Sequence, residues 1–204
     1  MNSSDDNKAF WQKTARMYAP IQERTNRKLY AAVTARSKPY IVGKTVLELA
    51  CGSGQLTLPL YRLAARWHAA DYAENMIAAA RKRCPAAEFA VEDASVLPHA
   101  DGSFQVVLIG NALHILPDPE AVLEEAKRVL CADGILLVPT FVYEGRVNRL
   151  RMWLTTKLGF RTYHEWTLAE LARQVEAAGF SIIETALLPG SPLPEGFVAA
   201  RKVS

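Results

Sequence analysis

Cysteine is scarce in this chain. Only three of its 204 residues are cysteines, at positions 51, 84 and 131, and no two of them form a C-x-x-C pair. An odd, widely spaced set favours neither a disulfide framework nor a zinc site, and it is typical of a reducing compartment. We therefore expect a cytoplasmic protein without structural disulfides.

Long apolar runs are also missing. Gly134 to Tyr143, one of the longest, falls well short of the roughly 20 residues that cross a bilayer. The N-terminus carries Asp5 and Asp6 where a secretory signal would have basic residues. These absences predict neither a transmembrane helix nor a signal peptide. At roughly 150 residues per domain, the length predicts a single domain over residues 1–204.

The chain has no large excess of charge of one sign, because it holds 24 basic and 21 acidic residues and its net charge is +3. Nucleic-acid-binding proteins usually carry a far larger local excess, so we expect no nucleic-acid partner. The surplus is concentrated in residues 145–163, which hold five basic residues and no acidic one. Their apolar residues recur at helical spacing, which predicts a basic amphipathic helix.

Short aliphatic runs alternate with longer helical patterns, an order typical of a parallel sheet covered by helices. We expect strands over residues 45–50, 66–70, 88–91, 104–110, 135–141, 180–188 and 197–203. We expect helices over residues 55–65, 73–83, 119–130 and 167–178. Only a segment rich in Gly and Pro separates the last two strands, which predicts an antiparallel pair. The pattern therefore predicts an α/β fold with a doubly wound, Rossmann-like, seven-stranded sheet that is mostly parallel.

Two stretches lie outside this alternation. Residues 7–38 have apolar residues at helical spacing around Pro20 and predict a helical N-terminal cap, whose second helix ends near Arg36. Residues 145–163 lie between the fifth strand and the last helix, where insertions commonly cover the ligand crevice of open α/β sheets. We expect this insertion to form a helical lid.

A glycine-containing loop follows the first predicted strand directly. Gly52 and Gly54 permit positive φ and a close approach of the backbone to a ligand. A tight turn without a ligand would explain the two glycines alone. Glu48 precedes them, however, and its charge would repel a pyrophosphate. The loop therefore favours a ligand with an ammonium or sulfonium group.

Four segments occur in a fixed order along the chain: E-L-A-C-G-S-G at 48–54, D-Y-A-E-N-M at 71–76, V-E-D-A-S-V-L-P at 91–98 and S-F-Q-V-V-L-I-G-N-A-L-H-I-L at 103–116. Together they resemble the class I S-adenosylmethionine (SAM)-dependent methyltransferases. A fifth segment at 128–138 is similar to the family's stretch through strand five, with Asp133 where a second glycine is usual. The resemblance covers nearly the whole chain and is nearest to the small-molecule group that includes ubiquinone/menaquinone-biosynthesis C-methyltransferases.

This resemblance implies SAM as cofactor, S-adenosylhomocysteine (SAH) as product, and a set of binding residues. Asp71 would accept hydrogen bonds from the two ribose hydroxyls and could also cap the following helix. Asp93 and the N–H of Ala94 would read adenine, an interpretation favoured over Asp93 as a surface acid after the third strand. Glu48 would hold the amino group of SAM through water, and the glycine loop would pack against the methionine part. The implied set is Glu48, Ala50, Gly52, Gly54, Asp71, Tyr72, Met76, Asp93, Ala94 and Asn111.

His114 and Tyr18 are the candidates for the catalytic side. A histidine could take a proton from the acceptor, and packing at the pocket mouth is an equally good interpretation of His114. Tyr18 resembles the family's N-terminal tyrosine, which closes over the methionine end. His68, His99 and His164 are scattered in the sequence without ligand spacing, so no metal site is predicted.

The resemblance implies methyl transfer to a small acceptor. An apolar or aromatic acceptor fits the aromatic residues Trp153, Phe160, Tyr163 and Trp166. Two other interpretations stay open: a SAM-binding module without transfer activity, and methylation of a lipid or macromolecule. Residues 145–163 could act as a lid, bind an acidic ligand or contact a membrane surface. The sequence leaves the oligomeric state open.

Overall fold

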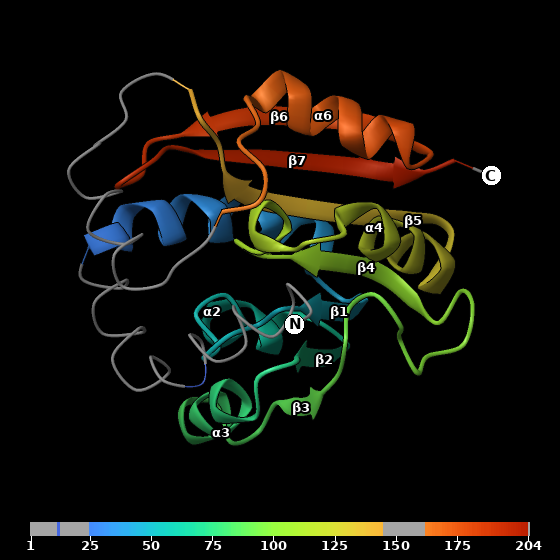
Figure 1. Ribbon diagram of the computed structural model, residues 1–204. Helices are drawn as coiled ribbons and strands as arrows, with labels where there is room; N and C mark the ends of the chain where they lie inside the picture. The colour runs from blue at the N-terminus through green and yellow to red at the C-terminus, as the bar shows by residue number, and fades with distance from the viewer. Residues whose placement is uncertain (1–11, 13–24, 145–161, 204) are drawn as a thin grey trace.

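One seven-stranded sheet organises the protein in a computed structural model, which describes residues 12, 25–144 and 162–203 (Figure 1). The strand order is β3-β2-β1-β4-β5-β7-β6. The strands are β1 (Thr45–Leu49), β2 (Arg66–Asp71), β3 (Glu88–Val91), β4 (Phe104–Ile109), β5 (Leu130–Phe141), β6 (Phe180–Leu188) and β7 (Glu195–Lys202).

Strands β1 to β5 are parallel to one another, whereas β7 runs antiparallel to both β5 and β6. The expected mostly parallel sheet with a C-terminal antiparallel pair is therefore confirmed. The final strand lies inside the sheet, between β5 and β6, and not at its edge.

Helices cover both faces of the sheet (Figure 1). The helix over residues 25–41 packs on one face together with α2 (Thr57–Leu60) and α3 (Glu74–Arg83). The other face carries α4 (Pro119–Val129) and α6 (Leu168–Ala177). Two short 3₁₀ helices, η1 (Tyr61–Leu63) and η2 (Leu113–Ile115), complete the described elements.

The sequence of β4 explains why both faces are covered. Val106 and Leu108 point into the core on the side of α3, while Val107 and Ile109 point into the core on the side of α4. All four side chains are at most 1% exposed. A strand with apolar residues at successive positions must be buried on both faces, and two helical layers provide that burial.

Capping residues fix where α4 and α6 begin. Asp118 accepts a 3.0 Å hydrogen bond from the N–H of Ala121, and Pro119 takes the first helical position of α4. Thr167 and Glu170 form a capping box at the start of α6. Gly179, with φ of +85°, ends that helix.

Several predicted boundaries were wrong. The helix expected over residues 55–65 is only α2 followed by η1, because Pro59 lacks an N–H and Ala64 is extended. Strand β5 begins at Leu130 and not at 135. The register of its pairing with β4 shifts near Asp133, where φ is +57°, and the pairing then resumes, so the strand continues across this irregularity. The second N-terminal helix continues past Arg36 to residue 41.

Part of the expected cap and lid lies outside the described residues, including Tyr18, Trp153, Phe160 and 145–161. The helix over residues 25–41 is held to the body by Asn26. Its side chain donates to Ser191 O at 2.9 Å and accepts from Ser191 N at 3.1 Å. In the part of the chain that the structure describes, no helix has the length and apolar content to cross a membrane.

Candidate functional site

A pocket opens at the carboxyl ends of the parallel strands, where the strand order reverses between β1 and β4. Open α/β sheets bind their ligands at this switch point. Nine of the ten cofactor residues expected from the sequence line the pocket: Glu48, Ala50, Gly52, Asp71, Tyr72, Met76, Asp93, Ala94 and Asn111. The fold thus brings together residues from four separate sequence segments.

The loop after β1 has the positive φ angles that its glycines suggested. Gly52 and Gly54 have φ of +55° and +81°, and Ala50 also has a positive φ of +52°. Gly54 does not line the pocket. It lies on the inner side of the loop, near Thr57, Ala80 and Cys84, so it shapes the turn behind the lining residues.

Asp71 holds this loop in place from the end of β2. Its Oδ2 accepts a 2.9 Å hydrogen bond from the N–H of Gly52, and its Oδ1 accepts one of 2.9 Å from the N–H of Ala73. The alternative role as helix cap was wrong, because the N-cap of α3 is Ala73 and no side chain caps it. Burial raises the pKa of Asp71 to about 6, although the two backbone donors oppose that rise.

Glu48 lies at the floor of the pocket and is 1% exposed. Its Oε2 accepts hydrogen bonds from Thr57 Oγ1 at 2.5 Å and from Trp67 Nε1 at 3.1 Å. Burial raises the pKa of Glu48 to about 8 despite these donors. At neutral pH this carboxyl is therefore largely protonated, and it is a polar group more than a negative charge.

Asn111 follows β4 by two residues and adopts a left-handed conformation, with φ of +54°. Its N–H donates to Pro139 O at 2.7 Å, which fixes the turn against β5. Its side chain lies beside Glu195, a fully buried acid of β7 whose pKa burial raises to about 8, while the neighbouring Asn111 amide opposes the rise. Sequence analysis missed Glu195 because the predicted last strand began two residues later.

Two buried polar atoms of the pocket have no hydrogen-bond partner among the described residues: Gln55 Nε2 and Asn111 Oδ1. A buried amide donor or acceptor without a partner costs stability, so such atoms mark places where a ligand is expected to supply the partner. Sequence analysis overlooked Gln55, although it directly follows the glycine loop.

Asp93 follows β3 at another side of the pocket. Its Oδ1 accepts from Ser95 N at 2.9 Å and from Ser95 Oγ at 2.7 Å, which makes a local turn that orients the backbone of Ala94. Glu92 also lines the pocket, and its N–H donates to Asp71 O at 3.2 Å. The turn after β3 is therefore tied to the end of β2.

His114 is buried behind the pocket and is not among its lining residues. Its Nδ1 lies 2.7 Å from Thr140 Oγ1, and its ring meets that of Phe141 edge-on at 5.6 Å. Burial, together with the smaller effect of nearby His164, lowers the pKa of His114 to about 3. The imidazole is thus neutral at physiological pH.

The segment after the expected lid is fastened to η2. The backbone carbonyl of His114 accepts from the N–H groups of Tyr163 and His164, each at 3.1 Å. His164 stacks on Trp166 with ring centroids 4.6 Å apart. Tyr163 is close enough to Tyr72 to help raise its pKa, after burial and Asp71. Aromatic side chains therefore gather next to the pocket wall.

Comparison with known proteins identifies the central segment. Residues 47–138 match a family model described as a methyltransferase domain. Demethylmenaquinone methyltransferase of Clavibacter sepedonicus is 33% identical over 119 residues, which are 57% of this chain and 49% of that protein. A ubiquinone/menaquinone biosynthesis C-methyltransferase of Roseobacter denitrificans is 35% identical over 107 residues, 48% of this chain and 43% of that protein. The chain thus spans about half the length of these curated relatives.

Solved structures match over nearly the whole chain. A SAM-dependent methyltransferase of Thermotoga maritima, described as a possible histamine N-methyltransferase, has a TM-score of 0.76 at 20% identity, covering 96% of this chain and 99% of that one. The 1,6-didemethyltoxoflavin-N1-methyltransferase of Burkholderia thailandensis, solved with its substrate and SAH, has a TM-score of 0.75 at 20% identity, with coverages of 98% and 89%. At such identities the likeness concerns the fold. Residues 47–138 therefore match a methyltransferase domain, and the fold around them is that of the solved SAM-dependent methyltransferases.

Proposed function

We propose that this protein transfers a methyl group from SAM to a small, apolar or aromatic acceptor. The observation that carries the proposal is the convergence of nine expected cofactor residues on one pocket at the switch point of the sheet. The demethylmenaquinone and ubiquinone/menaquinone relatives support a small-molecule acceptor.

The polar groups of the pocket fit the methionine end of SAM. Gln55 Nε2 offers a donor for its carboxylate, and Asn111 Oδ1 offers an acceptor for its ammonium group. Glu48, neutral at pH 7, can assist through water. When bound, SAM supplies an electrophilic methyl group on a sulfonium. The work of these residues is to hold that methyl in line with the acceptor, which is the main requirement of a displacement reaction.

The other end of SAM would lie along β2 and β3. Each oxygen of Asp71 already accepts one backbone hydrogen bond and keeps a second lone pair for a ribose hydroxyl. Asp93 and the N–H of Ala94 would then read adenine. This assignment places a buried carboxylate, held rigidly by two backbone donors, against a vicinal diol.

His114 acts, in this proposal, as a packing residue and not as the general base. A base with a pKa of about 3 is poorly matched to proton transfer at neutral pH. Its bond to Thr140 and its backbone link to Tyr163 instead fix the wall beside which the acceptor would enter. Acceptors that need no deprotonation, or that ionise by themselves, fit this arrangement best.

The proposed partners are those that the sequence led us to expect. Residues 145–163 would cover the acceptor, and their basic face could also meet an acidic ligand or a membrane surface. A macromolecular or lipid acceptor is the competing function, and a SAM-binding module without activity is another. Nucleic acid remains a disfavoured partner because the net charge is only +3.

Calorimetric titration with SAM, SAH and NAD tests the cofactor. SAM and SAH should bind to one site per chain, and NAD should not bind. Asp71→Ala should weaken SAM binding by about 1.5 to 3 kcal/mol, the usual effect of losing hydrogen bonds to a charged group. Binding of NAD without SAM would refute the proposal.

Formation of SAH from SAM in the presence of a metabolite extract tests the activity itself. The wild-type chain should release SAH faster than Asp71→Ala at equal concentration. SAM binding without any acceptor-dependent SAH release would favour the module without transfer activity.

A further inference from the structure

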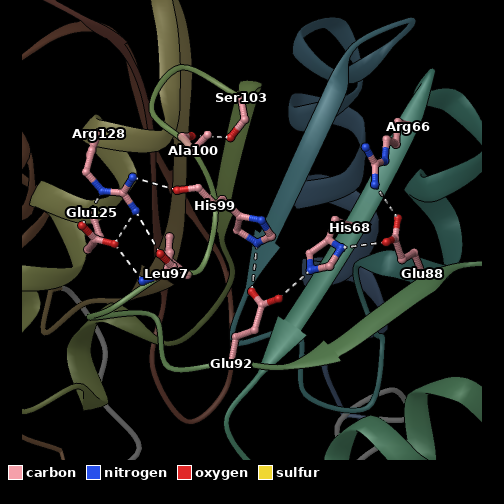
Figure 2. A network of polar contacts seen from close by, with 10 residues as sticks. All are labelled: Arg66, His68, Glu88, Glu92, Leu97, His99, Ala100, Ser103, Glu125 and Arg128. Atoms are coloured by element: carbon pink, nitrogen blue, oxygen red, sulfur yellow. Dashed lines mark hydrogen bonds and ion pairs between the residues drawn. The ribbon is translucent and has the colours of Figure 1, made fainter.

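Two histidines and a glutamate meet on the sheet beside β2 and β3, away from the predicted methyl-transfer end (Figure 2). His68 belongs to β2, Glu92 follows β3, and His99 lies in the loop before β4. Glu92 Oε1 lies 2.9 Å from His68 Nε2, and Glu92 Oε2 lies 3.0 Å from His99 Nε2. His68 and His99 are far apart in the sequence, and the fold brings them together.

We propose that His68, Glu92 and His99 bind one divalent transition-metal ion, with Zn²⁺ as the best match. Two imidazoles and one carboxylate are a donor set that Zn²⁺ accepts. One ligand atom from each residue lies within 4.8 Å of the other two. Bonds of about 2.0 to 2.2 Å in a tetrahedron hold ligand atoms about 3.3 Å apart, so small side-chain rotations suffice.

The site is built into the fold. The side chains of His68 and Glu92 are each 9% exposed, and that of His99 is 18% exposed. Three side chains that are largely shielded from water therefore face one another, and two imidazoles share one carboxylate. The remaining exposure lies at His99, where water could complete the coordination of an ion.

Arg128 of α4 holds the loop that carries His99. Its guanidinium donates to His99 O at 2.8 Å and to Leu97 O at 3.0 Å (Figure 2). Glu125 accepts from Arg128 Nε at 2.7 Å and from Leu97 N at 2.7 Å. Because the loop is fastened from α4, His99 is positioned before any ion binds, which lowers the entropy cost of binding.

A second carboxylate stands behind His68. His68 Nδ1 lies 3.4 Å from Glu88 Oε1, and the other oxygen of Glu88 pairs with Arg66 at 3.3 Å. Metal-bound histidines usually donate their second ring N–H to such a carboxylate, which fixes the ring and makes the free nitrogen a better ligand. The same arrangement here selects His68 Nε2 as the metal ligand.

The ion would stabilise the turn that shapes the pocket. Glu92 lines the pocket, and Asp93 and Ala94 follow it directly. Binding at His68, Glu92 and His99 would clamp residues 92–99 to the sheet. The proposed role is structural, and it does not depend on methyl transfer.

Metal binding can be measured on the full chain without SAM. The protein is stripped with a chelator, freed of the chelator, and titrated with ZnCl₂ by calorimetry and with CoCl₂ by visible absorption. We expect one ion per chain and the intense d–d bands of low-coordinate Co²⁺. At Zn²⁺ a hundredfold above the dissociation constant, the melting temperature should rise by about 5 to 10 °C.

His99→Ala, His68→Gln and Glu92→Gln should each lose the Co²⁺ bands and at least tenfold in Zn²⁺ affinity, by removing one ligand of three. His164→Ala is the matched control, because His164 stacks on Trp166 outside the cluster, and it should bind like wild type. Circular dichroism verifies that each variant is folded, and His99→Ala is the variant most tolerant of change because His99 is the most exposed of the three.

Several results would overturn the proposal. One is a wild-type chain that binds no ion, in which case Glu92 simply accepts hydrogen bonds from both imidazoles. Another is a folded His99→Ala chain with unchanged Zn²⁺ affinity. A thiolate charge-transfer band of Co²⁺ that disappears in Cys131→Ser would assign the ion to cysteine instead. Each readout is independent of SAM, so failure here leaves the proposed methyl transfer untouched.

Discussion

Affinity for SAM should fall as the pH drops through about 6, because Asp71 then becomes protonated. Its pKa is about 6 in the free protein against an ordinary 3.8, since burial penalises the charge. In the proposed complex two ribose hydroxyls donate to the carboxylate, which favours its charged form. Binding therefore competes with a proton, and the competition strengthens below pH 6.

The magnitude follows from the two pKa values. At pH 5 about one tenth of the free protein carries a charged Asp71, so the dissociation constant should be about tenfold higher than at pH 7.5. If the complex restores the ordinary pKa, the loss approaches its limit of about 3 kcal/mol only below about pH 3. Glu48 and Glu195 contribute little below pH 7, because pKa values of about 8 leave each of them about nine tenths protonated or more there.

Calorimetry between pH 5 and 7.5 at constant ionic strength provides the measurement. Repeating the titration in buffers of different ionisation enthalpy counts the protons released, and nearly one per SAM is expected at pH 5. Asp71→Asn is the control, with weak binding that hardly changes with pH. An affinity that is flat in the wild type, or that falls equally in Asp71→Asn, would refute the reasoning.

Three further predictions concern stability, each measured by urea unfolding. The pKa of Glu195 in the folded state is about 8, above its ordinary 4.5, so ionisation of Glu195 costs folding free energy. Stability should therefore fall as the pH rises between these two values. Glu195→Gln should be more stable than wild type at pH 9, with a much smaller difference at pH 5. Thr140→Val removes the 2.7 Å partner of His114 Nδ1 and should cost about 1 to 3 kcal/mol. Gly54→Ala should cost about 1 to 2 kcal/mol because φ is +81°, and an unchanged midpoint would contradict this.

The sequence predicted well those features that depend on neighbouring residues. Strand β4 shows its burial on both faces in the apolar run from Val106 to Ile109, and Asp118 with Pro119 predicts where α4 begins. Asp71 and Gly52 could be placed together because Asp71 ends one strand and Gly52 lies in the loop after its neighbour, and the carboxyl ends of parallel strands meet at one edge. Local patterns therefore located both the sheet and most of the pocket.

Features that depend on distant contacts escaped prediction. Glu195 meets Asn111 only because β7 pairs antiparallel with β5, a register that no local pattern specifies. His99 reaches His68 because Arg128 draws the loop before β4 against the sheet. The low pKa of His114 comes from burial, which spacing in the sequence does not reveal.

The position of β7 imposes an order on folding. Strand β6 is synthesised before β7, yet its only neighbour in the sheet is β7, which also covers the open edge of β5. Until residues 195–202 emerge from the ribosome, β5 exposes an unpaired edge and β6 has no sheet to join. A nascent chain that stalls before residue 195 would thus present the open edge of β5 and an unpaired β6. Such a chain is a natural client for chaperones, and its aggregation should depend on how quickly β7 arrives.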